Sequence, residues 1–181
     1  MVRKQTIRIM TRTCQKTSLF LLKLVSNRNP FYDSKNINEV DFSNAVMEQT
    51  NWNSEKANPY VIKSDESLLK LFCMNNTISK GITATNVGFY GPQGRQLRIP
   101  LSDSLLNDKL TQFNFNGQKI TNLEMETSGI YGLSRLLGHK SISLNAILAN
   151  RATKTFSKSP NETVDNLIQL ALNILTENGK N

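Results

Sequence analysis

Cysteine and histidine are scarce in this chain of 181 residues. It contains two cysteines, Cys14 and Cys73, and one histidine, His139. The cysteines lack the close spacing typical of zinc sites, so we expect no metal site. Two isolated cysteines are also typical of reduced thiols, which favours a cytoplasmic protein.

Long apolar runs are also missing. The run at residues 19–22 is interrupted by Lys23 and is far shorter than the roughly 20 residues that a membrane-spanning helix needs. We therefore expect no contact with a membrane.

Acidic residues are absent from residues 1–28, which hold seven of the chain's 22 Lys and Arg residues. Most of the net charge of +8 comes from this stretch, and the remainder is close to neutral. Three interpretations remain open: divergence or a disrupted reading frame, a mitochondrial targeting segment, and an arm that binds phosphate backbones. We treat residues 1–30 as a basic segment of doubtful structure and residues 31–181 as the folded domain.

Apolar periodicity predicts alternating helices and strands in the rest of the chain, which favours a layered α/β domain. The predicted helices cover residues 38–49, 64–74, 105–113, 127–137 and 162–178. The predicted strands cover residues 60–62, 81–85, 119–123 and 141–149. Ser64 and Asn161 are the expected caps of two helices. The helix at 127–137 is expected to bury Ile130, Leu133, Leu136 and Leu137.

Residues 88–95 read Gly-Phe-Tyr-Gly-Pro-Gln-Gly-Arg. The Gln93 amide offers a donor and an acceptor, and the Arg95 guanidinium is a planar cation with several donors. An aromatic pair, Phe89 and Tyr90, precedes them. This combination suits a flat heterocycle with carbonyl and imide edges.

Residues 122–127 read Asn-Leu-Glu-Met-Glu-Thr and place two carboxylates one residue apart. A carboxylate can accept hydrogen bonds from vicinal sugar hydroxyls. Alternate residues of an extended segment share a face, so Glu124 and Glu126 can point the same way. A segment suited to a base and a segment suited to a sugar together indicate a nucleoside.

Both segments resemble the nucleoside phosphorylase family, most closely its uridine-specific members. Residues 147–151, Ile-Leu-Ala-Asn-Arg, add a third similarity to the pyrimidine-specific branch. The resemblance runs from about Phe31 to the end of the chain and returns at residues 6–9. It implies a three-layer α/β/α sandwich around a mixed central sheet. Because family members are longer, it also implies a fold that is incomplete at the N-terminus.

The resemblance also implies roles for individual residues. It implies that Phe89, Gln93 and Arg95 contact the base, and that Arg151 has a looser role on the same side. On the ribose side it implies Glu126 and Met125, whereas Glu124 either contacts the sugar or holds the site. The two residues expected to be catalytic are Arg95 and Glu126.

For phosphate, Arg8 and Thr11 match an arginine and a threonine of the family. Met10 stands where the family has a turn glycine, and its bulk should clash with a bound anion or strain the backbone. Further phosphate contacts of the family precede the matching region. We therefore expect weak or absent phosphorolysis in this chain alone.

The implied reaction is phosphate-dependent cleavage of a pyrimidine nucleoside to the free base and ribose 1-phosphate, as in pyrimidine salvage. It needs inorganic phosphate as co-substrate and no metal or organic cofactor. The resemblance also implies a homo-oligomer. A catalytically inactive nucleoside-binding protein is the alternative. A basic nucleic-acid-binding protein is a weaker one, and we expect no nucleic-acid partner.

Overall fold

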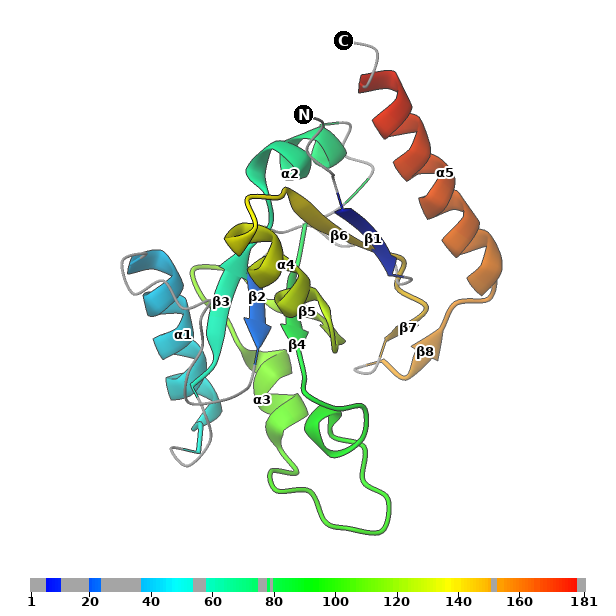
Figure 1. Cartoon of the computed structure of the whole chain (residues 1–181). Helices are drawn as coiled ribbons and strands as arrows, with labels where there is room; N and C mark the ends of the chain where they lie inside the picture. The colour runs from blue at the N-terminus through cyan, green and yellow to red at the C-terminus, as the bar shows by residue number, and fades with distance from the viewer. Residues whose placement is uncertain are drawn as a thin grey trace. The chain divides into compact units, whose positions relative to one another are not determined.

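The computed structural model describes residues 6–10, 20–23, 37–53, 58–74, 78, 80–150 and 153–178. The chain divides into two compact units. Figure 1 labels the helices and strands of each. The first unit comprises residues 1–16, 64–80 and 139–181, and the second comprises residues 17–63 and 81–138.

Among the described residues, the second unit is built on a four-stranded mixed sheet in the order β3-β2-β4-β5. Strand β2 runs antiparallel to β3 and parallel to β4, and β4 runs parallel to β5. The strands are β2 (Phe20–Lys23), β3 (Tyr60–Lys63), β4 (Ile82–Thr85) and β5 (Ile120–Glu124). Its helices are α1 (Ile37–Thr50), the short 3₁₀ helix η1 (Gly91–Gln93), α3 (Leu106–Gln112) and α4 (Thr127–Leu136).

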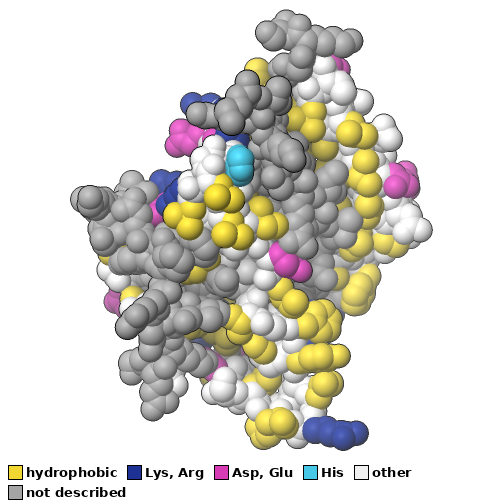
Figure 2. Space-filling model, viewed as in Figure 1, with side chains coloured by type: hydrophobic (Ala, Val, Ile, Leu, Met, Phe, Trp, Pro, Cys, Tyr) yellow, Lys and Arg dark blue, Asp and Glu magenta, His cyan; other side chains and the backbone are white. Residues whose placement is uncertain are grey.

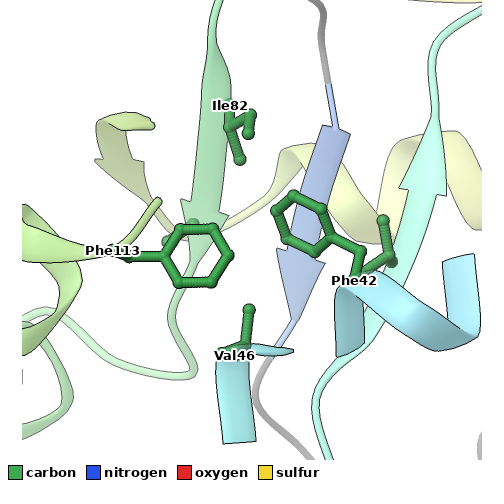
Figure 3. Packing of buried hydrophobic residues seen from close by; sticks show 6 residues of the cluster. Phe42, Val46, Ile82 and Phe113 are labelled. Carbon is green, nitrogen blue, oxygen red and sulfur yellow. The ribbon is translucent and has the colours of Figure 1, made fainter. Parts of the chain in front are cut away.

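Helices cover both faces of this sheet because side chains alternate along each strand. On β3, Val61 packs with Phe42 and Val46 of α1. Figure 3 shows Phe42 and Val46 beside Ile82 and Phe113 of the same cluster. The neighbours of Val61 on β3, Tyr60 and Ile62, pack with Tyr131 of α4 on the other face. The second unit therefore has the layered α/β architecture that the sequence predicted and the α/β/α order that the family resemblance implied.

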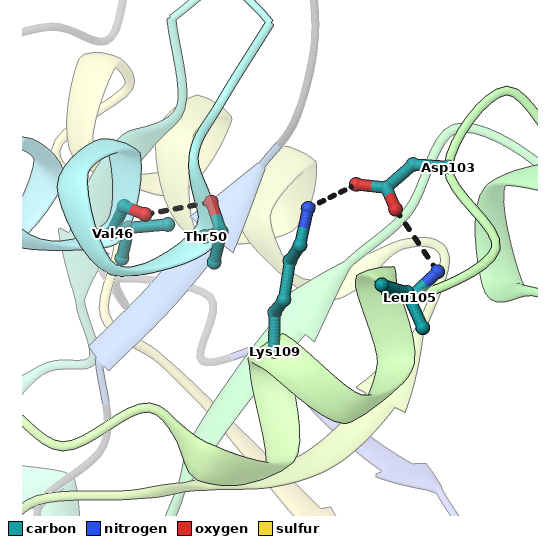
Figure 4. Close-up of polar contacts among 5 residues, drawn as sticks. All are labelled: Val46, Thr50, Asp103, Leu105 and Lys109. Atoms are coloured by element: carbon teal, nitrogen blue, oxygen red, sulfur yellow. Dashed lines mark hydrogen bonds and ion pairs between the residues drawn. The ribbon is translucent and has the colours of Figure 1, made fainter.

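Aromatic residues and short polar contacts hold the α1 side together. The ring centroids of Phe42 and Phe113 lie 5.2 Å apart. Asp103 holds the start of α3 by accepting hydrogen bonds from the Leu105 N–H at 3.0 Å and from Lys109 Nζ at 2.9 Å (Figure 4). The loop that precedes α3 is thereby tied to the helix.

The first unit pairs β1 (Thr6–Met10) with β6 (Ser141–Asn145) in parallel. Helices α2 (Glu66–Cys73) and α5 (Pro160–Asn178) pack together on one apolar cluster. The short strands β7 (Ala149–Asn150) and β8 (Thr155–Phe156) form a separate antiparallel pair. The buried members of the cluster are Leu68, Phe72, Ile142, Leu144 and Ala171.

One predicted strand boundary needs correction, and one strand was not predicted. The strand expected over residues 141–149 ends at Asn145, and Ala149 belongs to β7. Strand β2, which the sequence analysis treated only as a short apolar run, lies between β3 and β4. Strands β1 and β2 both fall within residues 1–30. The division of the chain at residue 30 itself stays a prediction.

Two helix predictions were wrong in detail. Asp65, not Ser64, caps α2, because its Oδ1 accepts a hydrogen bond from the Leu68 N–H at 3.0 Å. Helix α5 begins at Pro160, so Asn161 lies inside the first turn instead of capping it. Proline suits that first position because the first N–H groups of a helix have no partner within it.

The predicted apolar stripe of α4 was wrong for its three leucines, whereas Ile130 packs against the cluster of Tyr60, Ile62 and Tyr131. Leu133, Leu136 and Leu137 are 55%, 60% and 67% exposed, whereas Tyr131 is buried. Apolar side chains are visible on the surface of the face drawn in Figure 2. Leucines three or four residues apart share a helix face, but that spacing does not say which face meets the sheet. Within the described part of the chain, no helix combines the length and apolar character needed to cross a membrane.

Candidate functional site

The two segments suggested for nucleoside binding begin at the same edge of one sheet. Residues 88–95 follow β4, and residues 125–127 follow β5. These strands are parallel neighbours, and the Asn86 N–H donates to the Glu124 carbonyl at 2.7 Å just beyond the paired residues. Ligands of open α/β sheets commonly bind outside the carboxyl ends of the strands. This edge is therefore the candidate site (Figure 1).

A tight turn fixes the backbone of the first segment. The Tyr90 carbonyl accepts hydrogen bonds from the Gln93 N–H at 3.0 Å and from the Arg95 N–H at 2.9 Å. Gly94 has a φ of 70°, and a Cβ there would lie 2.1 Å from Nδ2 of Asn107. That Nδ2 donates to the Gln93 carbonyl at 3.1 Å, so a glycine at 94 allows α3 to hold the turn.

Within this turn, Gln93 and Arg95 form one assembled group. The Arg95 Nη1 donates to Oε1 of Gln93 at 2.6 Å and to the Phe89 carbonyl. The guanidinium carbon lies 3.8 Å from the centroid of the Phe89 ring, which is a cation–π stack. Gln93 is only 4% exposed. An amide held by its oxygen presents its NH₂ in a fixed direction, which suits recognition of a carbonyl edge.

The aromatic pair remains at the surface beside this group. Phe89 and Tyr90 are 50% and 55% exposed, and their rings meet edge to face at 5.2 Å. The face of Phe89 that stacks on Arg95 is used within the loop. The predicted packing of Phe89 against a base stays a prediction.

The Glu124 carboxylate is a hub of hydrogen bonds within the chain. Its Oε2 accepts from the Glu126 N–H at 2.8 Å, the Thr127 N–H at 2.8 Å and the Thr127 Oγ1 at 2.7 Å. Its Oε1 accepts from the Thr85 hydroxyl of β4. The residue is 7% exposed. Of the two roles that the resemblance left open, these contacts favour holding the site over contacting the sugar.

Glu124 thereby does the work of a helix cap for α4. Glu126 occupies the N-cap position, but its own side chain makes no capping hydrogen bond. The donors at the start of a helix need acceptors, and an anion there is favoured by the helix dipole. With the capping done by Glu124, the Glu126 carboxylate is not needed for that role. Met125, between the two acids, is 38% exposed.

Hydroxyl groups extend this network beneath the site. The Thr85 Oγ1 that donates to Glu124 also accepts from the Ser128 N–H at 3.2 Å. The Tyr60 hydroxyl reaches Ser128 Oγ at 3.4 Å. Burial raises the pKa of Tyr60 above its usual value, although the Ser128 contact opposes the shift. The sequence analysis missed Thr85 and Asn107. Strand alternation could have placed Thr85 on the α4 face, but nothing local indicated Asn107.

The remaining predicted residues belong to the first unit. Arg8 lies on β1 in register with Ser143 of β6. Thr11 and Arg151 lie outside the described residues. Among the described side chains, no three His, Cys, Asp or Glu residues group closely enough to hold a metal ion.

Comparison with known proteins supplies a fold. No protein-family model matches the sequence, and no curated protein matches it significantly. Solved structures do match. A Trypanosoma brucei nucleoside phosphorylase that shows uridine phosphorylase activity has a TM-score of 0.72 and 22% identity, over 94% of this chain and 63% of its own. The chain has the fold of the uridine phosphorylases.

Two further uridine phosphorylases support this assignment. One from the oomycete Phytophthora capsici matches with a TM-score of 0.59 and 15% identity, over 96% of this chain and 65% of its own. Isoform 2 from Schistosoma mansoni matches with a TM-score of 0.56 and 19% identity, over 96% of this chain and 58% of its own. This chain thus spans about three fifths of the length of the uridine phosphorylases that it resembles.

Proposed function

We propose that this chain binds a pyrimidine nucleoside at the carboxyl ends of β4 and β5, and that its reaction, impaired in this chain alone, is phosphate-dependent cleavage to the base and ribose 1-phosphate. The assembled Gln93–Arg95 pair is the observation that carries the proposal. A fixed amide beside a fixed guanidinium matches the carbonyl and imide groups on the rim of a uracil ring.

The chemistry assigned to these residues follows from the reaction. Cleavage of the bond between the sugar and the base leaves negative charge on the base. A positioned cation lowers the barrier if it faces that charge as it develops. Arg95 supplies the cation and is already oriented by its stack on Phe89. Glu126 binds the ribose hydroxyls, and inorganic phosphate is the co-substrate.

Nucleoside binding without catalysis is the second candidate, and one observation favours it. Strand β1 stays paired with β6 through Met10, which is in register with Asn145. The resemblance places a glycine of a phosphate-binding turn at that position. Extended, paired backbone replaces the open turn that an anion needs there.

Calorimetry with uridine tests binding. We expect measurable affinity for the parent chain and about a tenfold or larger loss of affinity for Arg95→Lys. Lysine lacks the planar group that can stack on an aromatic ring and donate two hydrogen bonds at once. Arg98→Lys is the matched control, since Arg98 is an exposed arginine of the same loop. Equal affinities for the Arg95→Lys and Arg98→Lys variants would refute the base-side assignment.

A second assay separates the two candidates. Purified protein is incubated with uridine, with and without inorganic phosphate, and free uracil is quantified. Phosphate-dependent release of uracil supports the phosphorylase. Uridine binding with no release under either condition supports the non-catalytic candidate.

A further inference from the structure

Asn86 is a buried amide whose hydrogen bonds are not made within the described part of the chain. It is 2% exposed, and neither its Oδ1 nor its Nδ2 has a hydrogen-bond partner there. Buried side-chain amides in native proteins nearly always have partners, because leaving one unpaired costs stability. An unpaired buried amide therefore needs an explanation, and a bound ligand is one.

The position of Asn86 indicates which ligand. It directly follows β4, and its N–H donates to the Glu124 carbonyl at 2.7 Å. Asn86 therefore lies beside the end of β5, which leads to Glu126, and two residues before the loop that carries Gln93 and Arg95. It thus adjoins both the loop assigned to the base and the strand end that leads to the ribose group.

Its chemistry fits that position. A primary amide donates and accepts at the same time. Near the bond between base and sugar, a pyrimidine ribonucleoside presents a ring carbonyl, which accepts, and a 2′-hydroxyl, which donates. The hydroxyl of the adjacent Thr85 is already bonded to Glu124.

We infer that Asn86 contacts the bound nucleoside and is a further specificity-determining residue of the site. The inference rests on the proposed function, because it takes the nucleoside as the ligand. It makes a distinctive claim about the free protein: the amide is retained at a cost in stability for the sake of binding. Natural proteins commonly give up stability in this way at functional sites.

The test is Asn86→Leu, which replaces the amide with an apolar group of similar size. We expect uridine affinity to fall about tenfold, the loss for a missing hydrogen-bonding partner, at 1.4 kcal/mol for each factor of ten. The melting temperature of the free protein should stay unchanged or rise, because a buried unpaired amide is removed. Calorimetry with uridine and thermal unfolding without ligand give the two readouts.

Asn122→Leu is the matched control. Asn122 lies on the neighbouring strand β5, and its Nδ2 reaches Thr83 Oγ1 at 3.4 Å. Loss of this amide should leave uridine affinity within about twofold of the parent and should not raise the melting temperature. If Asn86→Leu does not yield folded protein, Asn86→Ala removes the same amide without adding bulk, and the same criteria apply.

Each result decides the matter. Weaker uridine binding with an unchanged or higher melting temperature supports a ligand contact. A lower melting temperature means that Asn86 is structural, whatever happens to the affinity, and overturns the inference. Unchanged affinity overturns it too. If the unmodified chain does not bind uridine, the proposed function fails first, so the two failures are distinguishable.

Discussion

At the scale of single residues, the two glutamates of the Glu-Met-Glu segment have different jobs. Glu124 is buried and accepts four hydrogen bonds from three residues. Glu126, two positions on, contributes its N–H to that arrangement. A carboxylate that holds the backbone of its neighbours determines where the second carboxylate can lie. We therefore propose that Glu124 positions Glu126 for the ribose ligand.

Replacement of Glu124 by glutamine should be strongly destabilising. Three donors converge on Oε2, and an amide NH₂ placed there would face them with another donor. We expect Glu124→Gln to lower the free energy of unfolding by about 3 kcal/mol, measured by urea titration, because buried hydrogen bonds to a charged group are lost.

The matched control for that experiment is Glu48→Gln, an exposed acid near the end of α1. It should change the free energy of unfolding by less than about 0.5 kcal/mol. Equal effects of the two substitutions would contradict the role given to Glu124.

At the scale of helices and strands, the cap of α2 links stability to pH. Burial raises the pKa of Asp65, but hydrogen bonds from Ser67 and Leu68 and the charge of Lys140 outweigh it, and the net pKa lies below its usual value. A carboxyl with a lowered pKa stabilises the fold above its unfolded pKa of about 3.8. That contribution disappears as the pH falls through the lower, folded value.

We therefore expect Asp65→Ala to cost about 1 kcal/mol of unfolding free energy at pH 7, as is usual for loss of a helix cap. The difference from the parent should shrink as the pH is lowered below about 4. Denaturant unfolding at pH 7 and at successively lower pH measures it. Ser64→Ala, at the position that the sequence favoured, should have a smaller effect at pH 7. A difference for Asp65→Ala that persists undiminished at low pH would count against this account.

The buried face of α4 gives a second prediction at this scale. Tyr131 packs against Tyr60 and Ile62 of β3, whereas Leu136 is 60% exposed. Tyr131→Ala should cost about 3–5 kcal/mol, the usual effect of removing a large buried side chain. Leu136→Ala should stay within about 0.5 kcal/mol. Thermal or urea unfolding of both variants checks this. A larger loss for Leu136→Ala would restore the leucine stripe as the core face.

At the scale of the whole molecule, the proposed base and ribose groups lie in the second unit, except Arg151, which belongs to the first. Hydrogen exchange with and without uridine should therefore show protection at residues 85–95 and 124–128, where the backbone surrounds the candidate site. Helices α2 and α5, which belong to the other unit, should be unaffected. Protection found mainly in α2 and α5 would place nucleoside binding elsewhere in the chain.

The basic character of the chain is also a property of the whole molecule. Most of the net charge of +8 comes from residues 1–28, not from the surroundings of β4 and β5. A nucleic-acid-binding role would show as retention on DNA that weakens steeply with salt. Uridine should not displace such binding, so that role can be separated from the nucleoside site.

The sequence by itself determined which residues form most helices and strands, and which side chains suit a base and a sugar. Apolar periodicity and turn residues act over a few positions, so the elements that they specify can be predicted from the sequence alone. That is why α1, β3, β4 and α4 lie close to their predicted bounds, and why Gln93 and Arg95 could be named together.

Only the tertiary structure decided the partners of those side chains. Glu124 meets Thr85 across 39 positions because β5 lies beside β4, and no local pattern encodes that neighbour. Likewise, β2 lies in the interior of its sheet, and α4 packs Tyr131 against β3 while its leucines are exposed to solvent. Strand order and helix rotation depend on contacts between distant segments, and these contacts form only when the chain packs.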